Sequence, residues 1–131
     1  MQRILVIDDE PFVLDALKRV LGTTAVVVAA STADAGLTAM SESPVDLVII
    51  DVILPGMDGV AAIKIIRRDY PGVRIIAISG GGNFGLNSYL PDAISTSAYL
   101  AACKAAGADG VLAKPFETAE PRSLIDQVQA A

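Results

Sequence analysis

Short apolar runs rich in β-branched residues alternate along this chain with segments of helical character. Strands are predicted where these runs occur, over Arg3 to Ile7, Ala25 to Ala30, Asp46 to Ile50, Val73 to Ile78 and Gly110 to Ala113. The second to fourth runs are apolar at nearly every position, which is typical of strands covered by helices on both faces. The alternation therefore predicts a parallel sheet whose strands are joined by helical crossovers.

The stretches between the runs have the length and end signals of helices. Helices are predicted over Pro11 to Leu21, Thr32 to Ser41, Val60 to Asp69, Ser97 to Ala106 and Arg122 to Ala130. Ser31 with Asp34 resembles a capping box, Gly22 and Gly107 stand at C-cap positions, and Pro71-Gly72 separates the third helix from the fourth strand. We expect an α/β fold with a five-stranded, doubly wound parallel sheet.

Length and charge narrow the class of protein. At 131 residues the chain fits one domain, over residues 1–131, and its net charge of −5 with scattered Lys and Arg predicts no direct nucleic-acid binding. The apolar runs are too short to span a membrane, and the first meets acidic residues too early for a signal peptide, so a cytoplasmic protein is expected. Cys103 is the lone cysteine and is expected to be buried, and the chain has no His to serve as a base or phosphohistidine.

Polar residues follow the strands of the predicted sheet. Asp8 and Asp9 follow the first strand, Asp51 the third, Ser79 the fourth and Lys114 the fifth. Each has an ordinary explanation by itself, as a helix-capping carboxylate, a turn residue, a satisfied hydroxyl or a solvated charge. Together they converge, because the carboxyl ends of parallel strands open onto one edge of a sheet.

Three carboxylates at one edge require positive charge nearby. Each pair repels by about 4 kcal/mol at about 4 Å and an effective dielectric of about 20. Lys114 supplies one positive charge, and a hard divalent ion such as Mg²⁺, which prefers carboxylate oxygens, supplies the rest. Asp51 could then attack phosphorus as a nucleophile, while Lys114 and Ser79 contact the transferring group.

These motifs resemble those of response-regulator receiver domains, and the resemblance covers essentially the whole chain. Its most specific parts are the stretch Asp51-Val-Ile-Leu-Pro-Gly-Met-Asp-Gly59 and the later Lys114-Pro-Phe116. The resemblance implies a flavodoxin-like sheet with strand order 2-1-3-4-5. It also implies phosphorylation on Asp51 and a Mg²⁺ site formed by Asp8, Asp9, Asp51 and the backbone carbonyl of Ile53.

The same resemblance assigns roles to the remaining residues. Ser79 would be the switch hydroxyl, and Lys114, held by a cis Lys114-Pro115 peptide, would contact the phosphoryl group. Two features depart from the family pattern: Val111 replaces the usual aromatic residue, and the segment from Gly80 to Thr96 forms a long Gly-rich loop after the fourth strand. We expect this loop to substitute for the missing aromatic switch.

The leading hypothesis is a stand-alone signalling module that catalyses only its own phosphorylation and dephosphorylation. The implied partners are a sensor histidine kinase or histidine phosphotransfer protein and a downstream protein target, and a homodimer is compatible with this hypothesis. The first alternative is a small aspartyl-phosphate phosphatase of the haloacid dehalogenase type, although Ile53 stands where that family has its second Asp. A degenerate, binding-only receiver and a flavodoxin-like cofactor module are further alternatives, the latter disfavoured because carboxylates would repel a phosphate.

Overall fold

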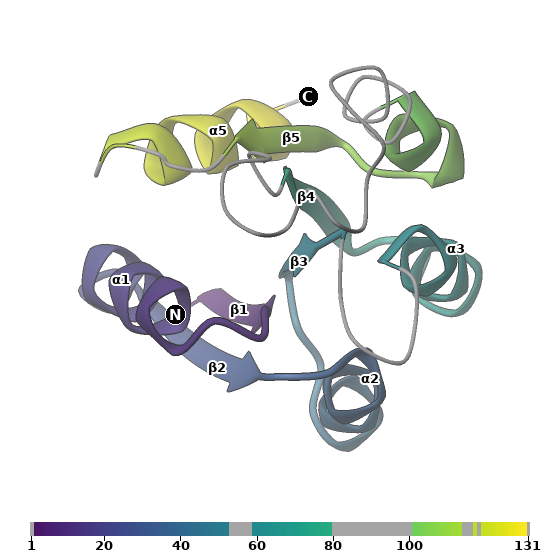
Figure 1. The fold of residues 1–131 in the computed structure, drawn as a ribbon, viewed down its shortest axis with the longest axis horizontal. Coiled ribbons are helices and arrows are strands. Elements are labelled where there is room, and N and C mark those ends of the chain that lie inside the picture. The colour runs from purple at the N-terminus through teal and green to yellow at the C-terminus, as the bar shows by residue number, and fades with distance from the viewer. Residues whose placement is uncertain (1, 53–58, 80–100, 114–116, 118, 131) are drawn as a thin grey trace.

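A five-stranded parallel sheet forms the centre of the computed structural model, which describes residues 2–52, 59–79, 101–113, 117 and 119–130 (Figure 1). Its strands are β1 (Gln2–Ile7), β2 (Ala25–Ala30), β3 (Leu47–Asp51), β4 (Arg74–Ser79) and β5 (Gly110–Ala113). All neighbouring pairs are parallel, and the strand order is β2-β1-β3-β4-β5. The predicted fold and strand order are confirmed, with strand boundaries displaced by one residue at most.

Helices cover both faces of the sheet. They are α1 (Pro11–Leu21), α2 (Ala33–Glu42), α3 (Gly59–Asp69) and α5 (Ala119–Ala130), and residues 101–106 are also helical. Figure 1 shows α1 and α5 on one side of the sheet, with α2, α3 and the 101–106 helix on the other. The predicted fourth helix began at Ser97, and residues 97–100 lie outside the described residues.

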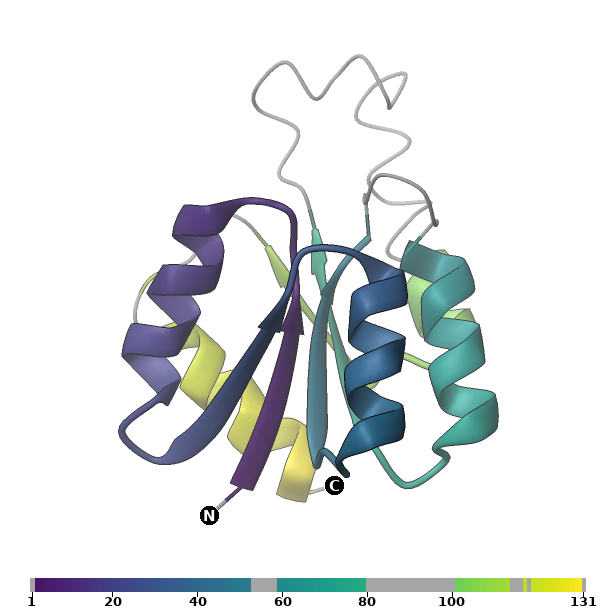
Figure 2. The same cartoon turned by 90° about the horizontal axis from the view of Figure 1, so that it is seen from below.

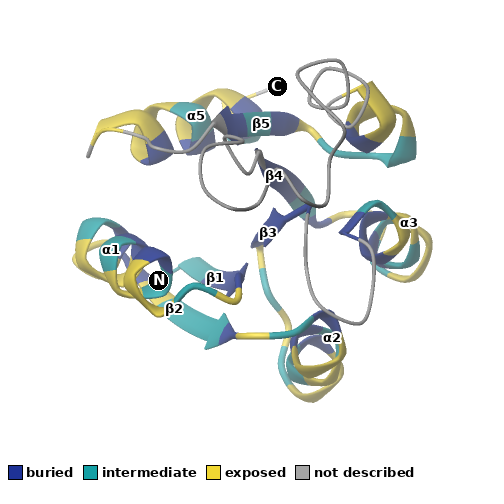
Figure 3. Cartoon of the chain, viewed as in Figure 1, coloured by how far each residue is buried: buried dark blue, intermediate teal, exposed yellow. Residues whose placement is uncertain are grey.

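The core is divided into two layers by the sheet. Leu5 and Ile7 of β1 belong to the layer beneath α2 and α3, whereas Ile4 and Val6 belong to the layer beneath α1 and α5. Every residue of β3 is buried, in agreement with the apolar run from Leu47 to Ile50 that precedes Asp51 (Figure 3). Cys103 is fully buried within the first layer, as predicted.

Three helix starts differ from the prediction. Helix α3 begins one residue earlier than expected, at Gly59. Thr32, not Ser31, is the N-cap of α2, and its Oγ1 accepts a hydrogen bond of 3.0 Å from Ala35 N. The expected capping box of Ser31 and Asp34 is therefore wrong. Helix α5 begins at Ala119 instead of Arg122, because the first helical turn tolerates Pro121.

The amino edge of the sheet is held by Arg67, near the end of α3. Its guanidinium donates hydrogen bonds of 2.7 and 3.2 Å to Gly107 O and of 2.9 Å each to Pro71 O and Val73 O. It also forms a 2.8 Å salt bridge with Asp109, the residue before β5. Arg67 thus ties α3 to the starts of β4 and β5, at the edge opposite the predicted site.

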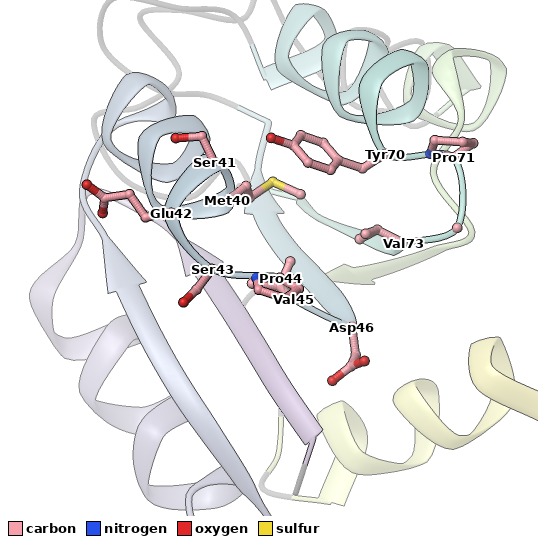
Figure 4. A pocket seen from close by; sticks show the side chains of 11 residues that line it. Met40, Ser41, Glu42, Ser43, Pro44, Val45, Asp46, Tyr70, Pro71 and Val73 are labelled. Atoms are coloured by element: carbon pink, nitrogen blue, oxygen red, sulfur yellow. The ribbon is translucent and has the colours of Figure 1, made fainter.

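A hollow of about 460 Å³ lies at this same amino edge, between the ends of α2 and α3 (Figure 4). Met40, Val45 and Tyr70 form part of its wall. Of the predicted site residues whose side chains the structure describes, Asp8, Asp9 and Asp51, none lines it. The acidic residues Asp8, Asp9 and Asp51 lie at the other edge, where the strands end.

Candidate functional site

The carboxylates of Asp8, Asp9 and Asp51 meet at the carboxyl edge of the sheet. Strands β1 and β3 pair in a register that places Ile7 beside Ile50, so Asp8 and Asp51 leave neighbouring strands at the same level. Asp8 is fully buried, Asp51 is 4% exposed, and Asp9 is exposed. Each of the three offers a carboxylate oxygen within 4.8 Å of the others. The structure brings together the acidic residues that the sequence predicted.

Backbone contacts fix the first acidic residue in place. Asp8 N donates a 3.0 Å hydrogen bond to Ala30 O, which extends the pairing of β1 with β2. The Asp8 Oδ1 atom accepts a 2.9 Å hydrogen bond from Glu10 N, just before α1 begins at Pro11. The Asp8 carboxylate therefore belongs to the acidic cluster and also accepts a hydrogen bond from the backbone just before α1.

The backbone after Asp51 is equally constrained. Val52 N donates to Ile78 O at 3.2 Å, and Gly59 N donates to Val52 O at 3.2 Å. A Cβ atom on Gly59 would lie 2.6 Å from Asp51 O, so only glycine allows α3 to begin this close to the end of β3. The last glycine of the predicted motif thus has a packing role beside Asp51.

The other predicted site residues are placed only in part. Ser79 ends β4, one position beyond Ile78, which pairs with Asp51. Ala113, the residue before Lys114, pairs with Ser79. Lys114 and Ile53 lie outside the described residues, so their roles stay predictions, as does the long loop expected over residues 80–96. Val111 is half-buried and packs against the core layer beneath α2 and α3.

The composition of the cluster fits a hard divalent cation. Its donors are carboxylate oxygens, which Mg²⁺ prefers, and it combines two buried carboxylates with one at the surface. An ion held there could keep several water ligands on its exposed side, as Mg²⁺ usually does. These residues therefore fit the magnesium site that the resemblance implies.

Phe12 is a surface residue near the site that the sequence analysis did not single out. Its side chain is 68% exposed, and it lies in the first turn of α1, shortly after Asp9. The buried residues of α1 are Val13, Leu17 and Leu21, and Phe12 lies outside that apolar stripe. The sequence could have indicated a contact surface here, because Phe12 is a large apolar residue that does not share the helical spacing of the buried residues.

Comparison with known proteins places these features in a family. The model of the response regulator receiver domain family matches residues 4–126. The DNA-binding response regulator MtrA of Mycolicibacterium smegmatis is 35% identical over 133 residues, covering 98% of this chain and 50% of that protein. The transcriptional regulatory protein YvrH of Bacillus subtilis is 32% identical over 119 residues, covering 89% of this chain and 44% of that protein.

Solved structures agree with these matches. The receiver domain of NtrX from Brucella abortus superimposes with a TM-score of 0.82 at 25% identity, with 98% of each chain covered. A response regulator receiver domain protein from Clostridium thermocellum gives a TM-score of 0.78 at 27% identity, covering 98% of this chain and 94% of that chain.

The matches cover only part of each curated relative, so the activities of the whole relatives are not assigned to this chain. The chain spans about half the length of the curated relatives it matches. Because one of them is named a DNA-binding regulator, the expectation of no nucleic-acid contact is not supported by the relatives and stays a prediction, as does the stand-alone arrangement. Among the described residues, no helix is long and apolar enough to cross a membrane. The family match and the acidic cluster at the strand ends agree, and the chain belongs to the response regulator receiver domain family.

Proposed function

We propose that this chain accepts a phosphoryl group on Asp51 and signals to a protein partner through the resulting change at the carboxyl edge. The observation that carries the proposal is the convergence of Asp51 with Asp8 and Asp9, whose carboxylate oxygens lie within 4.8 Å of one another. Asp51 is 4% exposed at the end of a buried strand, which fixes the direction of the nucleophile. The family match supports the same role for this position.

The proposed step is a displacement at phosphorus. A carboxylate oxygen of Asp51 forms a bond to phosphorus as the bond from phosphorus to the donor's imidazole nitrogen breaks, and the imidazole leaves with that electron pair. Asp8, Asp9, Asp51 and the carbonyl of Ile53 would hold Mg²⁺, which supplies charge neutralisation for the phosphoryl oxygens when bound. Lys114 and the Ser79 hydroxyl would contact those oxygens and hold the phosphorylated state.

The donor and the target are proteins in this proposal. Because the chain contains no His, the phosphohistidine belongs to a sensor histidine kinase or a histidine phosphotransfer protein. The chain catalyses its own modification without turnover on an external substrate. The family match favours this function over the haloacid dehalogenase alternative, which would need an acidic residue where Ile53 stands.

Phosphorylation by a small donor tests the proposal without knowledge of the kinase. The purified chain, incubated with acetyl phosphate and Mg²⁺, should gain one phosphoryl group by intact-mass analysis. Asp51→Asn should gain none. Asp126→Asn is the matched control, because Asp126 is an exposed carboxylate of α5, and it should be phosphorylated like the parent.

Two results would count against the proposal. Asp51→Asn that is phosphorylated like the parent would remove Asp51 as the acceptor. Steady hydrolysis of a phosphate monoester by the parent chain, lost in Asp51→Asn, would instead indicate the phosphatase alternative. The free energies of unfolding of both variants should be measured, so that loss of phosphorylation is not confused with loss of the fold.

A further inference from the structure

Strand β2 forms an open edge of the sheet. It is the terminal strand in the order β2-β1-β3-β4-β5, and the only described strand that pairs with it is β1 (Figure 1). Helix α1 packs on one face of β2 and α2 on the other, so the strand is covered above and below the sheet. The edge itself presents the backbone groups that do not face β1.

The backbone groups on this edge can be assigned from one hydrogen bond. Ala30 O accepts from Asp8 N at 3.0 Å, so Ala30 directs its backbone groups toward β1. Successive residues of a strand direct these groups to opposite sides, and Val28 and Val26 therefore also face β1. The N–H and C=O groups of Ala25, Val27 and Ala29 consequently point outward, away from the sheet.

The sequence of this edge lacks the features that usually prevent strand pairing. Natural edge strands are protected by charged side chains, proline, bulges or a covering segment. From Thr23 to Thr32 the chain contains no charged residue, no proline and no glycine. Val26 is 42% exposed, one of two large apolar side chains with such exposure among the described residues. A neutral, valine-rich strand of six residues is well suited to accept another strand.

We propose that a second copy of this chain adds to this edge, with the two β2 strands antiparallel about a twofold axis at Val27. A twofold axis perpendicular to the sheet places the α1 faces of both copies on the same side of the joined sheet. A residue on the α1 face of β2 must therefore lie opposite a residue on the α1 face of the second copy's β2. An axis through Val27 satisfies this condition. It places Val27 opposite Val27 of the second copy, Val26 opposite Val28, and Ala25 opposite Ala29.

The outward backbone groups fit this register. The two Val27 residues, which are partly exposed, exchange a reciprocal pair of hydrogen bonds at the axis. Ala25 is only 5% exposed, so the pairing of the two copies is centred on Val27 and its neighbours Val26 and Val28.

Charge also favours a second copy at this position. The chain carries a net charge of −5, so two copies repel each other overall, and contact through an uncharged surface adds least to that repulsion. The β2 edge is uncharged, and in this register valine and alanine side chains face one another across the interface. The pairing joins two sheets into one and leaves both acidic clusters accessible, because these lie at the strand ends and not at the sheet edge.

Cysteine crosslinking tests the position of the axis. In a hydrogen-bonded antiparallel pair the Cα atoms are about 5.5 Å apart, within the range of about 4.4–6.8 Å that a disulfide spans. Val27→Cys should therefore form a covalent dimer under mild oxidation. Val26→Cys is the control, because Val26 is the more exposed residue but lies opposite Val28 and not opposite itself. Crosslinking driven by exposure alone would be faster at position 26, and this result would overturn the proposed register.

Sedimentation equilibrium tests the association itself. The parent chain should show a reversible monomer–dimer equilibrium, and Val26→Lys should raise its dissociation constant at least tenfold, since lysine on an edge strand opposes pairing. Ser123→Lys adds the same charge at an exposed position of α5 and should leave the equilibrium unchanged. A parent chain that stays monomeric up to millimolar concentration, or equal effects of the two lysine variants, would refute the proposal. Phosphorylation by acetyl phosphate should proceed in Val26→Lys, which shows that the variant is folded.

Discussion

Asp8 and Asp51 leave adjacent strands at the same level and place their buried carboxylates side by side at the carboxyl edge of the sheet. This relationship follows from strand register, because Ile7 and Ile50 pair directly before them. The exposed Asp9 completes the cluster from the segment that leads into α1. The site is therefore built largely on the ends of rigid strands, which suits a reaction that needs a fixed nucleophile.

The first prediction concerns metal affinity. Asp9→Asn should weaken Mg²⁺ binding by at least about tenfold, equivalent to about 1.4 kcal/mol, because a carboxylate of the cluster becomes a neutral amide. The exposed position of Asp9 should leave the fold intact. Isothermal titration of the parent and the variant with Mg²⁺ measures the change.

A matched control separates the cluster from general charge. Asp15→Asn removes an exposed carboxylate from α1 outside the cluster and should bind Mg²⁺ like the parent. Mg²⁺ should also raise the melting temperature of the parent, because an ion that binds only the folded state stabilises it. If Asp9→Asn retains the parent's affinity, the acidic pair has a purely structural role.

The second prediction concerns Lys114. Lys114→Met should leave the chain folded and able to accept a phosphoryl group slowly, but it should abolish the conformational response, because the positive charge that holds the phosphoryl oxygens is gone. Amide exchange with and without beryllofluoride and Mg²⁺ measures the response. Phosphorylation and response both at the level of the parent would contradict the role given to this lysine.

The third prediction concerns the exposed Phe12. A protein that delivers a phosphoryl group to Asp51 has to approach the carboxyl edge, where Phe12 presents a 68% exposed ring. Buried aromatic contacts often dominate such interfaces. Phe12→Ala should therefore slow transfer from the cognate phosphohistidine protein about tenfold, equivalent to about 1.4 kcal/mol. Its phosphorylation by acetyl phosphate should be unchanged, and an equal loss with both donors would mean that Phe12 acts on the site and not on docking.

The fold could be predicted from the sequence because its strands are short, apolar and regularly spaced. Five separate runs with helical stretches between them leave few topologies other than a doubly wound parallel sheet. The convergence of Asp8, Asp9 and Asp51 then followed from that topology alone. Ser79 at the end of β4 was predictable by the same reasoning.

Some helix starts could not be predicted exactly, because neighbouring residues can serve equally well as the first residue or the cap of a helix. Ser31 and Thr32 are adjacent hydroxyl residues with similar capping ability, and the structure selects Thr32. Helix α5 begins at Ala119, three residues before the predicted start at Arg122, because proline is tolerated in a first turn. The roles of Lys114 and of the loop over residues 80–96 lie outside the described residues and stay predictions.

The last prediction concerns Gly36 of α2, which packs directly against Ile7, the residue before Asp8. A Cβ atom on Gly36 would lie 2.7 Å from Ile7 Cγ1 and closer still to Ile7 Cδ1. Ile7 is fully buried and has little room to yield. Overpacking of this kind costs about 1–3 kcal/mol, and the gain of about 1 kcal/mol in helix propensity offsets only part of it.

Gly36→Ala should therefore lower the free energy of unfolding by about 1 kcal/mol and weaken Mg²⁺ binding, since a displaced Ile7 also displaces Asp8. Gly72→Ala is the matched control, because a Cβ atom there would meet nothing within 4 Å. That variant should be neutral or more stable by up to about 1 kcal/mol, through the smaller entropy of its unfolded chain. Urea unfolding and Mg²⁺ titration of both variants measure the two effects. A Gly36→Ala protein as stable as Gly72→Ala would show that α2 can move away from β1 without cost.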